Sequence, residues 1–135
     1  MPTTAEREPL KVLLVEDSPL LAERLRELLG QVPGVTLTAV VNNESSAVSA
    51  IRSGGTDAVI LDLHLKQGTG FGVLRSTAGI ANPPDVIVLT NYALQQYRRE
   101  AQLLGVRYFL DKAREFERIP EVLREIADQR LPATH

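Results

Sequence analysis

The sequence predicts a doubly wound α/β domain, in which five parallel strands form one sheet and five helices cover both of its faces. Short apolar runs of strand length alternate along the chain with segments whose apolar residues recur at helical spacing. Such alternation favours parallel strands joined by right-handed crossovers. The strand-length runs are nearly all apolar, as expected for strands covered on both faces.

The first strand is expected at Lys11–Val15, after a polar leader of residues 1–10. Ser18 followed by Pro19 marks a helix start, because serine caps helices and proline suits the first helical position. Leucines spaced by four and three residues give this helix a buried stripe. Gly30 ends it.

The second strand is expected at Val35–Val41, and Asn43 then caps the second helix. Gly54 and Gly55 stop that helix. A short run of four apolar residues, Ala58–Leu61, is the third strand.

Gly68 and Gly70 predict a loop after the third strand, and the following helix is expected to run through Ala78. The sequence Asn82-Pro83-Pro84 is a turn before the fourth strand, Val86–Leu89.

The fourth helix is expected to end at Gly105, and Val106–Leu110 is the fifth strand. Proline breaks the interior of a helix, so the last helix should begin near Pro120. Residues Arg114–Arg118 then form a separate turn.

The composition fits one globular domain, residues 11–129, followed by a short tail, residues 130–135. Of the 135 residues, 44% are apolar and 24% are charged, and the absence of cysteine excludes disulfides and thiolate chemistry. The net charge of −2, without a basic block, argues against nucleic-acid binding. No apolar run is long enough to span a membrane and no signal peptide opens the chain, so we expect a cytoplasmic protein.

Polar residues follow four of the predicted strands. Glu16 and Asp17 follow the first strand, and Asp62, Thr90 and Lys112 follow the third, fourth and fifth. The carboxyl ends of parallel strands meet at one edge of the sheet, where ligands bind in open α/β folds. Paired acids hold a divalent cation, while a hydroxyl and an ammonium hold a phosphoryl group. The set therefore predicts phosphoryl chemistry.

Each of these residues has a simpler explanation when it is taken alone. An acid after a strand is often a solvated loop residue or a favourable charge at a helix start. Thr90 is also a good strand former, and Lys112 could be an ordinary surface lysine. Asp57 is an internal control, because it opens the strand that Asp62 follows and lies at the wrong end of the sheet. The prediction depends on the convergence of the set.

Four segments and the intervals between their polar residues indicate a family. The segments VLLVEDSP, AVILDLHLKQGTGFGVL, VIVLTN and GVRYFLDK resemble the receiver domain of bacterial two-component response regulators. The resemblance covers about residues 10–128. It implies the flavodoxin-like strand order 2-1-3-4-5, in which the first and third strands are neighbours.

The resemblance also implies residue roles. Asp62 would be the phosphoacceptor, and its carboxylate would attack a phosphohistidine in line. Mg²⁺ would be held by Glu16, Asp17 and Asp62, with the backbone carbonyl of His64 as a further ligand. Lys112 would pair with the phosphoryl group as a point charge.

The resemblance further implies a switch. Thr90 would hydrogen-bond a phosphoryl oxygen, and its movement would leave space for the ring of Phe109 to turn inward. The surface of the fourth helix, fifth strand and fifth helix would then signal to a downstream protein or form a phosphorylation-dependent homodimer. Candidate contacts on this surface, which could equally be a solvated face, are Arg98, Arg99, Gln102, Arg107 and Tyr108.

The chain departs from the family pattern at three positions. Ala113 and Lys66 stand where the family usually has proline, and Asn91 stands where it often has a small residue. Because Ala113 replaces proline, a cis peptide is not expected before it. None of these changes removes a required group. Two bulky residues near the site, His64 and Tyr92, could set the lifetime of the phosphoryl group, and we expect Tyr92 to hinder water.

These observations favour a stand-alone, non-enzymatic response regulator that is phosphorylated by a histidine kinase or a phosphotransfer protein. One alternative is an intermediate carrier in a phosphorelay, which would use the same site. Another is an interaction module that ignores phosphorylation, although the intact site argues against it. A phosphatase with an Asp-x-Asp motif is disfavoured by His64, and no glycine-rich dinucleotide motif follows the first strand.

Overall fold

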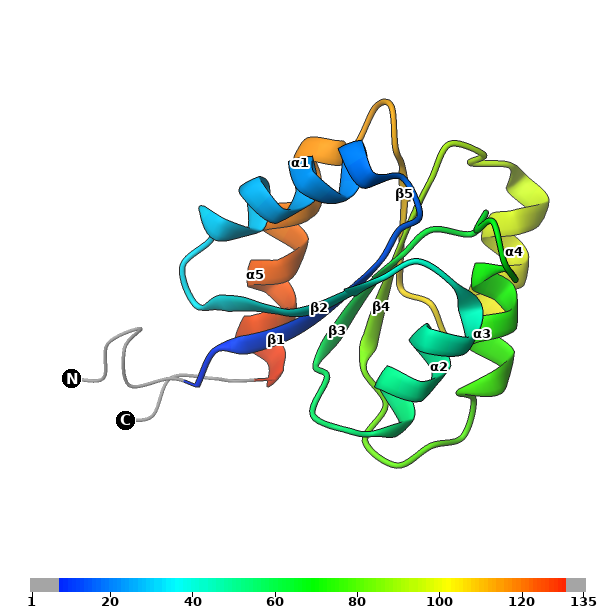
Figure 1. Cartoon of the computed structure of the whole chain (residues 1–135), viewed down its shortest axis with the longest axis horizontal. Coiled ribbons are helices and arrows are strands. Elements are labelled where there is room, and N and C mark those ends of the chain that lie inside the picture. Colours follow the sequence, from blue (N-terminus) through cyan, green and yellow to red (C-terminus); the bar gives the residue numbers. More distant parts are fainter. Residues whose placement is uncertain (1–7, 131–135) are drawn as a thin grey trace.

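The computed structural model describes residues 8–130, and these form one five-stranded sheet in the order β2-β1-β3-β4-β5. All four pairs of neighbouring strands are parallel. This confirms the predicted α/β class and strand order (Figure 1). The elements in chain order are β1 (Leu10–Val15), α1 (Pro19–Gly30), β2 (Val35–Val41), α2 (Glu44–Arg52), β3 (Ala58–Leu61), α3 (Gly70–Ser76), β4 (Asp85–Thr90), α4 (Gln95–Leu103), β5 (Tyr108–Asp111), the short 3-10 helix η2 (Phe116–Arg118) and α5 (Ile119–Arg130).

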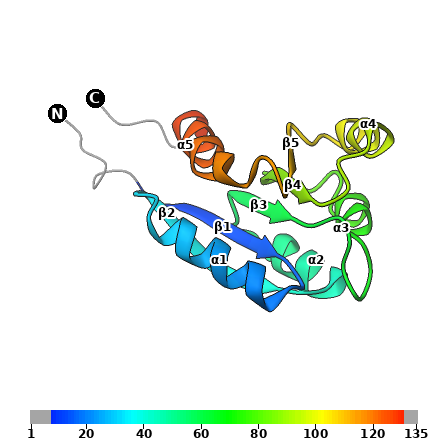
Figure 2. The ribbon, with the colours of Figure 1, turned by 90° about the horizontal axis from the view of Figure 1, so that it is seen from above.

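Helices cover both faces of the sheet. Figure 1 places α1 and α5 on one side and α2, α3 and α4 on the other, and Figure 2 shows the sheet from above. Successive residues of β1 point to opposite faces, so Leu14 packs in the core under α1 and α5 while Leu13 packs in the core under α2, α3 and α4. The sheet is therefore a rigid support buried between two apolar layers.

The predicted helix starts are confirmed where a capping side chain was identified. Ser18 accepts a hydrogen bond from the Leu21 N–H ahead of α1, and Asn43 accepts one from the Ser46 N–H ahead of α2. The separate turn before the last helix is also present, as η2, and α5 begins one residue before Pro120. These local signals fix both helix register and the ends of the preceding loops.

Several predicted boundaries differ from the structure by a few residues, and those of β5 and α3 have a clear physical reason. β5 begins at Tyr108 and not at Val106, because the Val106 N–H donates to Ala101 O at the end of α4. Gly70 is the first residue of α3 and not a loop residue, since Thr69 caps the helix. That helix stops at Ser76, before Ala78, and the Thr77 N–H closes its last turn.

β1 begins one residue before the domain range expected from the sequence, and α5 ends one residue after it. Leu10 is fully buried and its N–H donates to Gly34 O at 2.7 Å, so β1 begins there. α5 continues to Arg130. Residues 1–7 of the expected leader and 131–135 of the expected tail lie outside the described residues. Among residues 8–130, no helix is long and apolar enough to cross a membrane.

Candidate functional site

Three carboxylates meet at the carboxyl edge of the sheet. Val15 pairs with Leu61 in the ladder between β1 and β3, so the residues that follow these two strands are neighbours. One carboxylate oxygen each from Glu16, Asp17 and Asp62 lies within 4.8 Å of the others. Glu16 and Asp62 are buried, with 4% and 6% of their surface exposed, and Asp17 is half-buried. Three acids at this spacing repel one another unless a cation lies among them.

Lys112 supplies one positive charge to this cluster. Its Nζ lies 3.0 Å from Glu16 Oε1 and 3.1 Å from Asp62 Oδ2. Lys112 follows β5, and its N–H donates to Thr90 O at the end of β4, which holds its backbone at the same edge. The side chain is only 10% exposed. One ammonium therefore serves two buried carboxylates.

Burial and pairing act against each other on these ionisable groups. Burial raises the pKa of Glu16 above its ordinary value, although hydrogen bonds from the Ser18 N–H and Lys112 oppose the shift. Burial lowers the pKa of Lys112, but its hydrogen bonds to Glu16 and Asp62 and their charges outweigh burial and leave the pKa raised. Lys112 thus stays cationic, while the cluster keeps an excess of acidic groups.

Backbone N–H groups orient the same carboxylates. Each acid accepts one backbone hydrogen bond, either from the residue two positions on or from the loop after β3. The pairs are Glu16 Oε2 with the Ser18 N–H at 3.0 Å, Asp62 Oδ1 with the His64 N–H at 3.1 Å, and Asp17 Oδ2 with the Lys66 N–H at 2.8 Å. A proline in place of Lys66 could not make the last bond.

The donor set fits a hard divalent cation. The cluster offers carboxylate oxygens only, and Mg²⁺ is usually held by a few carboxylates together with waters and phosphate oxygens. Asp17 is the most accessible of the three acids, so an ion can enter from its side. The residues that could hold Mg²⁺ are thus Glu16, Asp17 and Asp62, and the backbone of His64 lies beside them through its bond to Asp62.

Thr90 lies at the same edge, at the end of β4. It is fully buried, and its hydroxyl accepts a hydrogen bond from the Tyr92 N–H at 3.1 Å. Asp57 lies at the opposite end of β3, where its carboxylate accepts from the Lys11 N–H at 2.8 Å and lies 3.9 Å from the Arg130 guanidinium. The two ends of one strand therefore carry acids in unrelated surroundings.

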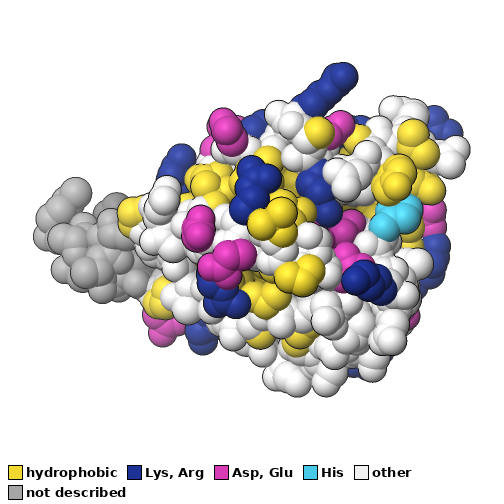
Figure 3. Space-filling view, turned by 45° about the horizontal axis from the view of Figure 1, so that its top comes forward, with side chains coloured by type: hydrophobic (Ala, Val, Ile, Leu, Met, Phe, Trp, Pro, Cys, Tyr) yellow, Lys and Arg dark blue, Asp and Glu magenta, His cyan; other side chains and the backbone are white. Residues whose placement is uncertain are grey.

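Aromatic rings flank the acidic cluster. The rings of His64 and Tyr92 are 4.4 Å apart, and Tyr97 extends the group to Phe71. Tyr92 is 52% exposed. In the space-filling view, acidic side chains lie recessed near basic ones, with a histidine and hydrophobic side chains alongside (Figure 3). Sequence reasoning singled out His64 and Tyr92 but not Phe71 and Tyr97 as residues near the site.

Phe109 is half-buried on β5 and is covered by an arginine. The Arg98 guanidinium lies 4.7 Å above its ring and donates to Phe109 O at 3.2 Å. The same guanidinium lies 3.9 Å from the Glu115 carboxylate. Arg98 therefore joins α4 to β5 and to the turn that precedes α5.

The candidate contacts on the surface of α4, β5 and α5 differ in their exposure. Arg99, Gln102 and Arg107 are exposed, whereas Arg98 and Tyr108 are half-buried. Arg107 lies 3.7 Å from Asp85, and its guanidinium stacks on the Tyr108 ring. An exposed apolar residue that sequence reasoning passed over, Leu103, is 83% exposed beside them.

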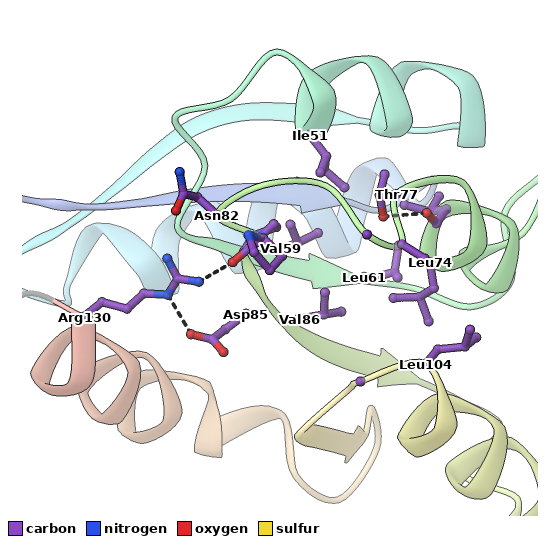
Figure 4. Close-up of a pocket in the computed structure, with 16 residues that line it drawn as sticks. Ile51, Val59, Leu61, Leu74, Thr77, Asn82, Asp85, Val86, Leu104 and Arg130 are labelled. Atoms are coloured by element: carbon purple, nitrogen blue, oxygen red, sulfur yellow. Dashed lines mark hydrogen bonds and ion pairs between the residues drawn. The ribbon is translucent and has the colours of Figure 1, made fainter.

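A cavity that none of the three clustered acids lines is formed largely by residues of β3, α3 and the start of β4. It has a volume of about 560 Å³ and an apolar floor that includes Val59, Leu61 and Leu74 (Figure 4). Arg130 lies at its rim and pairs there with Asp85 at 2.7 Å. No sequence pattern pointed to this cavity.

The family model described as the response regulator receiver domain matches residues 12–124. The sensory transduction protein LytT of Enterococcus faecalis is 28% identical over 120 residues, which are 89% of this chain and 49% of that protein. The probable C4-dicarboxylate response regulator DctR of Priestia megaterium is 30% identical over 115 residues, 84% of this chain and 50% of that protein. The chain thus spans about half the length of these relatives.

Solved structures show the same fold. The signal receiver domain of the putative response regulator NarL from Mycobacterium tuberculosis has a TM-score of 0.81 at 20% identity, covering 91% of this chain and 99% of that one. A chain of the CheX-CheY-BeF3-Mg+2 complex from Borrelia burgdorferi matches with a TM-score of 0.73 at 21% identity, covering 86% of this chain and 90% of that one.

Proposed function

This chain belongs to the response regulator receiver family, and from that premise we propose that it accepts a phosphoryl group on Asp62 from a phosphohistidine. The donor would be a histidine kinase or a histidine phosphotransfer protein. Glu16, Asp17, Asp62 and the His64 carbonyl would hold Mg²⁺, and Thr90 and Lys112 would hold the phosphoryl oxygens. The observation that carries the proposal is the group of three carboxylates, two of them buried, with the Lys112 ammonium beside the buried pair.

The geometry suits an in-line transfer. A carboxylate oxygen of Asp62 would form a bond to phosphorus, while the phosphorus–nitrogen bond of the donor breaks and the imidazole leaves with the electron pair. Bound Mg²⁺ would supply positive charge next to the transferred group. Lys112, already 3.1 Å from Asp62 Oδ2, would neutralise charge on the phosphoryl oxygens without a large movement. The His64 N–H would keep Asp62 oriented through Oδ1.

The readout would begin at Thr90. Its hydroxyl accepts from the Tyr92 N–H, and it could turn to donate its own proton to a phosphoryl oxygen. Movement of the loop after β4 would release Phe109 from its contact with Arg98 and change the surface formed by α4, β5 and α5. A downstream protein, or a second copy of the chain, would bind that changed surface.

The expectations about nucleic-acid binding and about the location of the protein remain predictions. Relatives and structural neighbours include proteins described as transcriptional regulatory or DNA-binding response regulators. The expectation that no nucleic acid is bound therefore applies only to the residues of this chain, whose net charge is −2. A location in the cytoplasm, whose reducing environment suits a chain without cysteine, also remains a prediction.

Intact mass after incubation with Mg²⁺ and acetyl phosphate tests the proposal. Wild type should gain one phosphoryl group, and Asp62→Asn should gain none. Asp57→Asn is the matched control, because it changes an aspartate on the same strand at the other edge and should gain one group like wild type. No gain in wild type would overturn the proposal and favour a phosphorylation-independent module. A gain in Asp62→Asn would mean that another residue is the acceptor.

A further inference from the structure

The loop between β3 and α3, residues 62–69, is held by a residue from outside the acidic cluster. We propose that Glu44, the first residue of α2, is a positioning residue that fixes this loop and thereby the His64 carbonyl for Mg²⁺ binding. The inference rests on the proposed function, because it concerns the same metal. It assigns Glu44 no contact with the metal or with the phosphoryl group.

Glu44 contacts the loop through both its backbone and its side chain. Its N–H donates to Gln67 O at 3.1 Å, and its carboxylate Oε1 accepts from the Thr69 N–H at 2.9 Å. These two bonds enclose one loop residue, Gly68. A carboxylate accepting a backbone N–H makes a charge-assisted bond, which is stronger than one between neutral groups.

The loop and α3 are shaped around the Glu44 side chain. Gly68 has φ +85°, and a Cβ there would overlap the Cβ of Glu44. Gly72, on the first turn of α3, lies so close that a Cβ would overlap the Glu44 carboxylate itself. Two glycines therefore leave the space that this one side chain fills. An ordinary glutamate at a helix start, which gains only from the helix dipole, requires no such space.

Thr69 connects Glu44 to the site. Its backbone pairs with that of His64 in an antiparallel bridge, and the Gly70 N–H donates to Leu63 O at 3.0 Å. The start and the end of the loop are thus hydrogen-bonded to each other, so a residue that fixes the backbone of Thr69 also fixes that of His64. Earlier in the loop, the Lys66 N–H donates to Asp17 Oδ2.

The position of the His64 carbonyl therefore depends on two carboxylates that bind the loop at different residues, Asp17 at Lys66 and Glu44 at Thr69. Asp17 belongs to the metal cluster, whereas Glu44 does not. Groups that orient a metal ligand typically affect metal affinity by about 10- to 100-fold when removed. A carbonyl ligand to a weakly held Mg²⁺ should give an effect near the lower end of this range.

Three variants of the full chain separate positioning from charge. Glu44→Ala removes the acceptor, and Glu44→Gln keeps an acceptor oxygen but removes the charge. Gly72→Ala keeps the charge, but its Cβ pushes the flexible carboxylate away from Thr69 and suits the helix at that position. The measurements are the Mg²⁺ dissociation constant by calorimetry without any phosphodonor, and hydrogen exchange at the Thr69 amide in the metal-free protein.

We expect Glu44→Ala and Gly72→Ala to weaken Mg²⁺ binding by roughly tenfold and to speed exchange at Thr69, with Glu44→Gln close to wild type. Equal loss in both Glu44 variants with no loss in Gly72→Ala would overturn the proposal in favour of long-range charge. Unchanged Mg²⁺ affinity in all three variants would also overturn it.

Failure of this proposal is distinct from failure of the proposed function. If wild type takes up a phosphoryl group on Asp62 and all three variants bind Mg²⁺ equally well, only the role of Glu44 is lost. If wild type binds no Mg²⁺ and takes up no phosphoryl group, the proposed function is lost as well. Thermal unfolding of each variant without Mg²⁺ shows whether a change in affinity merely follows a loss of folding.

Discussion

The Nζ of Lys112 lies 3.1 Å from Oδ2 of Asp62. The same Nζ lies 3.0 Å from Glu16, so one ammonium compensates two buried acids. Breaking a buried ion pair by removing one partner leaves uncompensated charge, which costs far more than the pair contributes to stability. A divalent cation bound at this cluster would therefore offset the same negative charge as Lys112.

Lys112→Met is expected to lower the free energy of unfolding of the metal-free protein by about 3 kcal/mol, because Glu16 and Asp62 would lose their cation. Added Mg²⁺ should then raise the melting temperature more in the variant than in wild type, since the ion replaces the missing charge. Thermal unfolding with and without Mg²⁺ checks this. Lys11→Met, at an exposed lysine, serves as control. An equal Mg²⁺ response in wild type and Lys112→Met would contradict the shared role.

The lifetime of the phosphoryl group is expected to depend on the ring of Tyr92. The Tyr92 ring contacts that of His64, two residues after Asp62, and the Tyr92 N–H donates to the Thr90 hydroxyl, so we expect the ring to shield Asp62 from water. Tyr92→Ala should speed hydrolysis of the acyl phosphate several-fold, and Tyr92→Phe, which keeps the ring, should not. Loss of the added mass with time after removal of acetyl phosphate measures the rate. Identical decay in wild type and Tyr92→Ala would show that water reaches the group by another route.

The position of Phe109 is expected to depend on Arg98. Its guanidinium stacks on the ring and donates to Phe109 O, and such a stack contributes about 0.5–1 kcal/mol at an exposed site. Arg98→Ala should therefore increase the population of the inward ring position without phosphorylation. NMR relaxation dispersion on the Phe109 ring measures the exchange. Arg99→Ala, one residue along the same helix and exposed, is the matched control. No exchange in either variant would mean that Arg98 does not restrain the ring.

Sequence reasoning was most accurate for features set by short segments, namely the residues that follow a strand and the side chains that cap a helix. Polar residues after the strands of a parallel sheet meet at one edge whatever their rotamers, which is why Asp62 and Asp57 could be assigned to opposite ends. Helix starts with a capping side chain, at Ser18 and Asn43, were placed correctly because the cap is a local interaction. Local chemistry and sheet topology together position most of the site.

The features that sequence reasoning missed depend on contacts between distant segments. Glu44 and Thr69 are 25 residues apart, and their bond exists only because the loop folds back along α2. Valine favours strands, yet the Val106 N–H donates to Ala101 O at the end of α4. Tertiary contacts override strand propensity at such positions, and no periodic pattern reports them.

Glu115 is expected to make stability depend on pH in the acid range. The Asp111 N–H donates a hydrogen bond to Glu115 Oε1, and this bond lowers the pKa of the carboxyl most. The charges of Arg118 and Arg98 lower the pKa further, while burial raises it. A carboxyl whose pKa is lower in the folded state stabilises the protein above its unfolded pKa of about 4.3. That contribution is lost as pH falls through the folded pKa.

Glu115→Gln keeps an oxygen for the Asp111 N–H and removes only the charge. Between pH 6 and 8 it should therefore lower the free energy of unfolding, by less than about 1 kcal/mol because the group is partly solvated. The difference from wild type should shrink below about pH 4.3 and vanish once Glu115 is protonated in both states. Urea unfolding at a series of pH values measures it, and Glu117→Gln in the same 3-10 turn controls for a general loss of negative charge. A difference that stayed constant down to the lowest pH would show that Glu115 acts through its shape and not its charge.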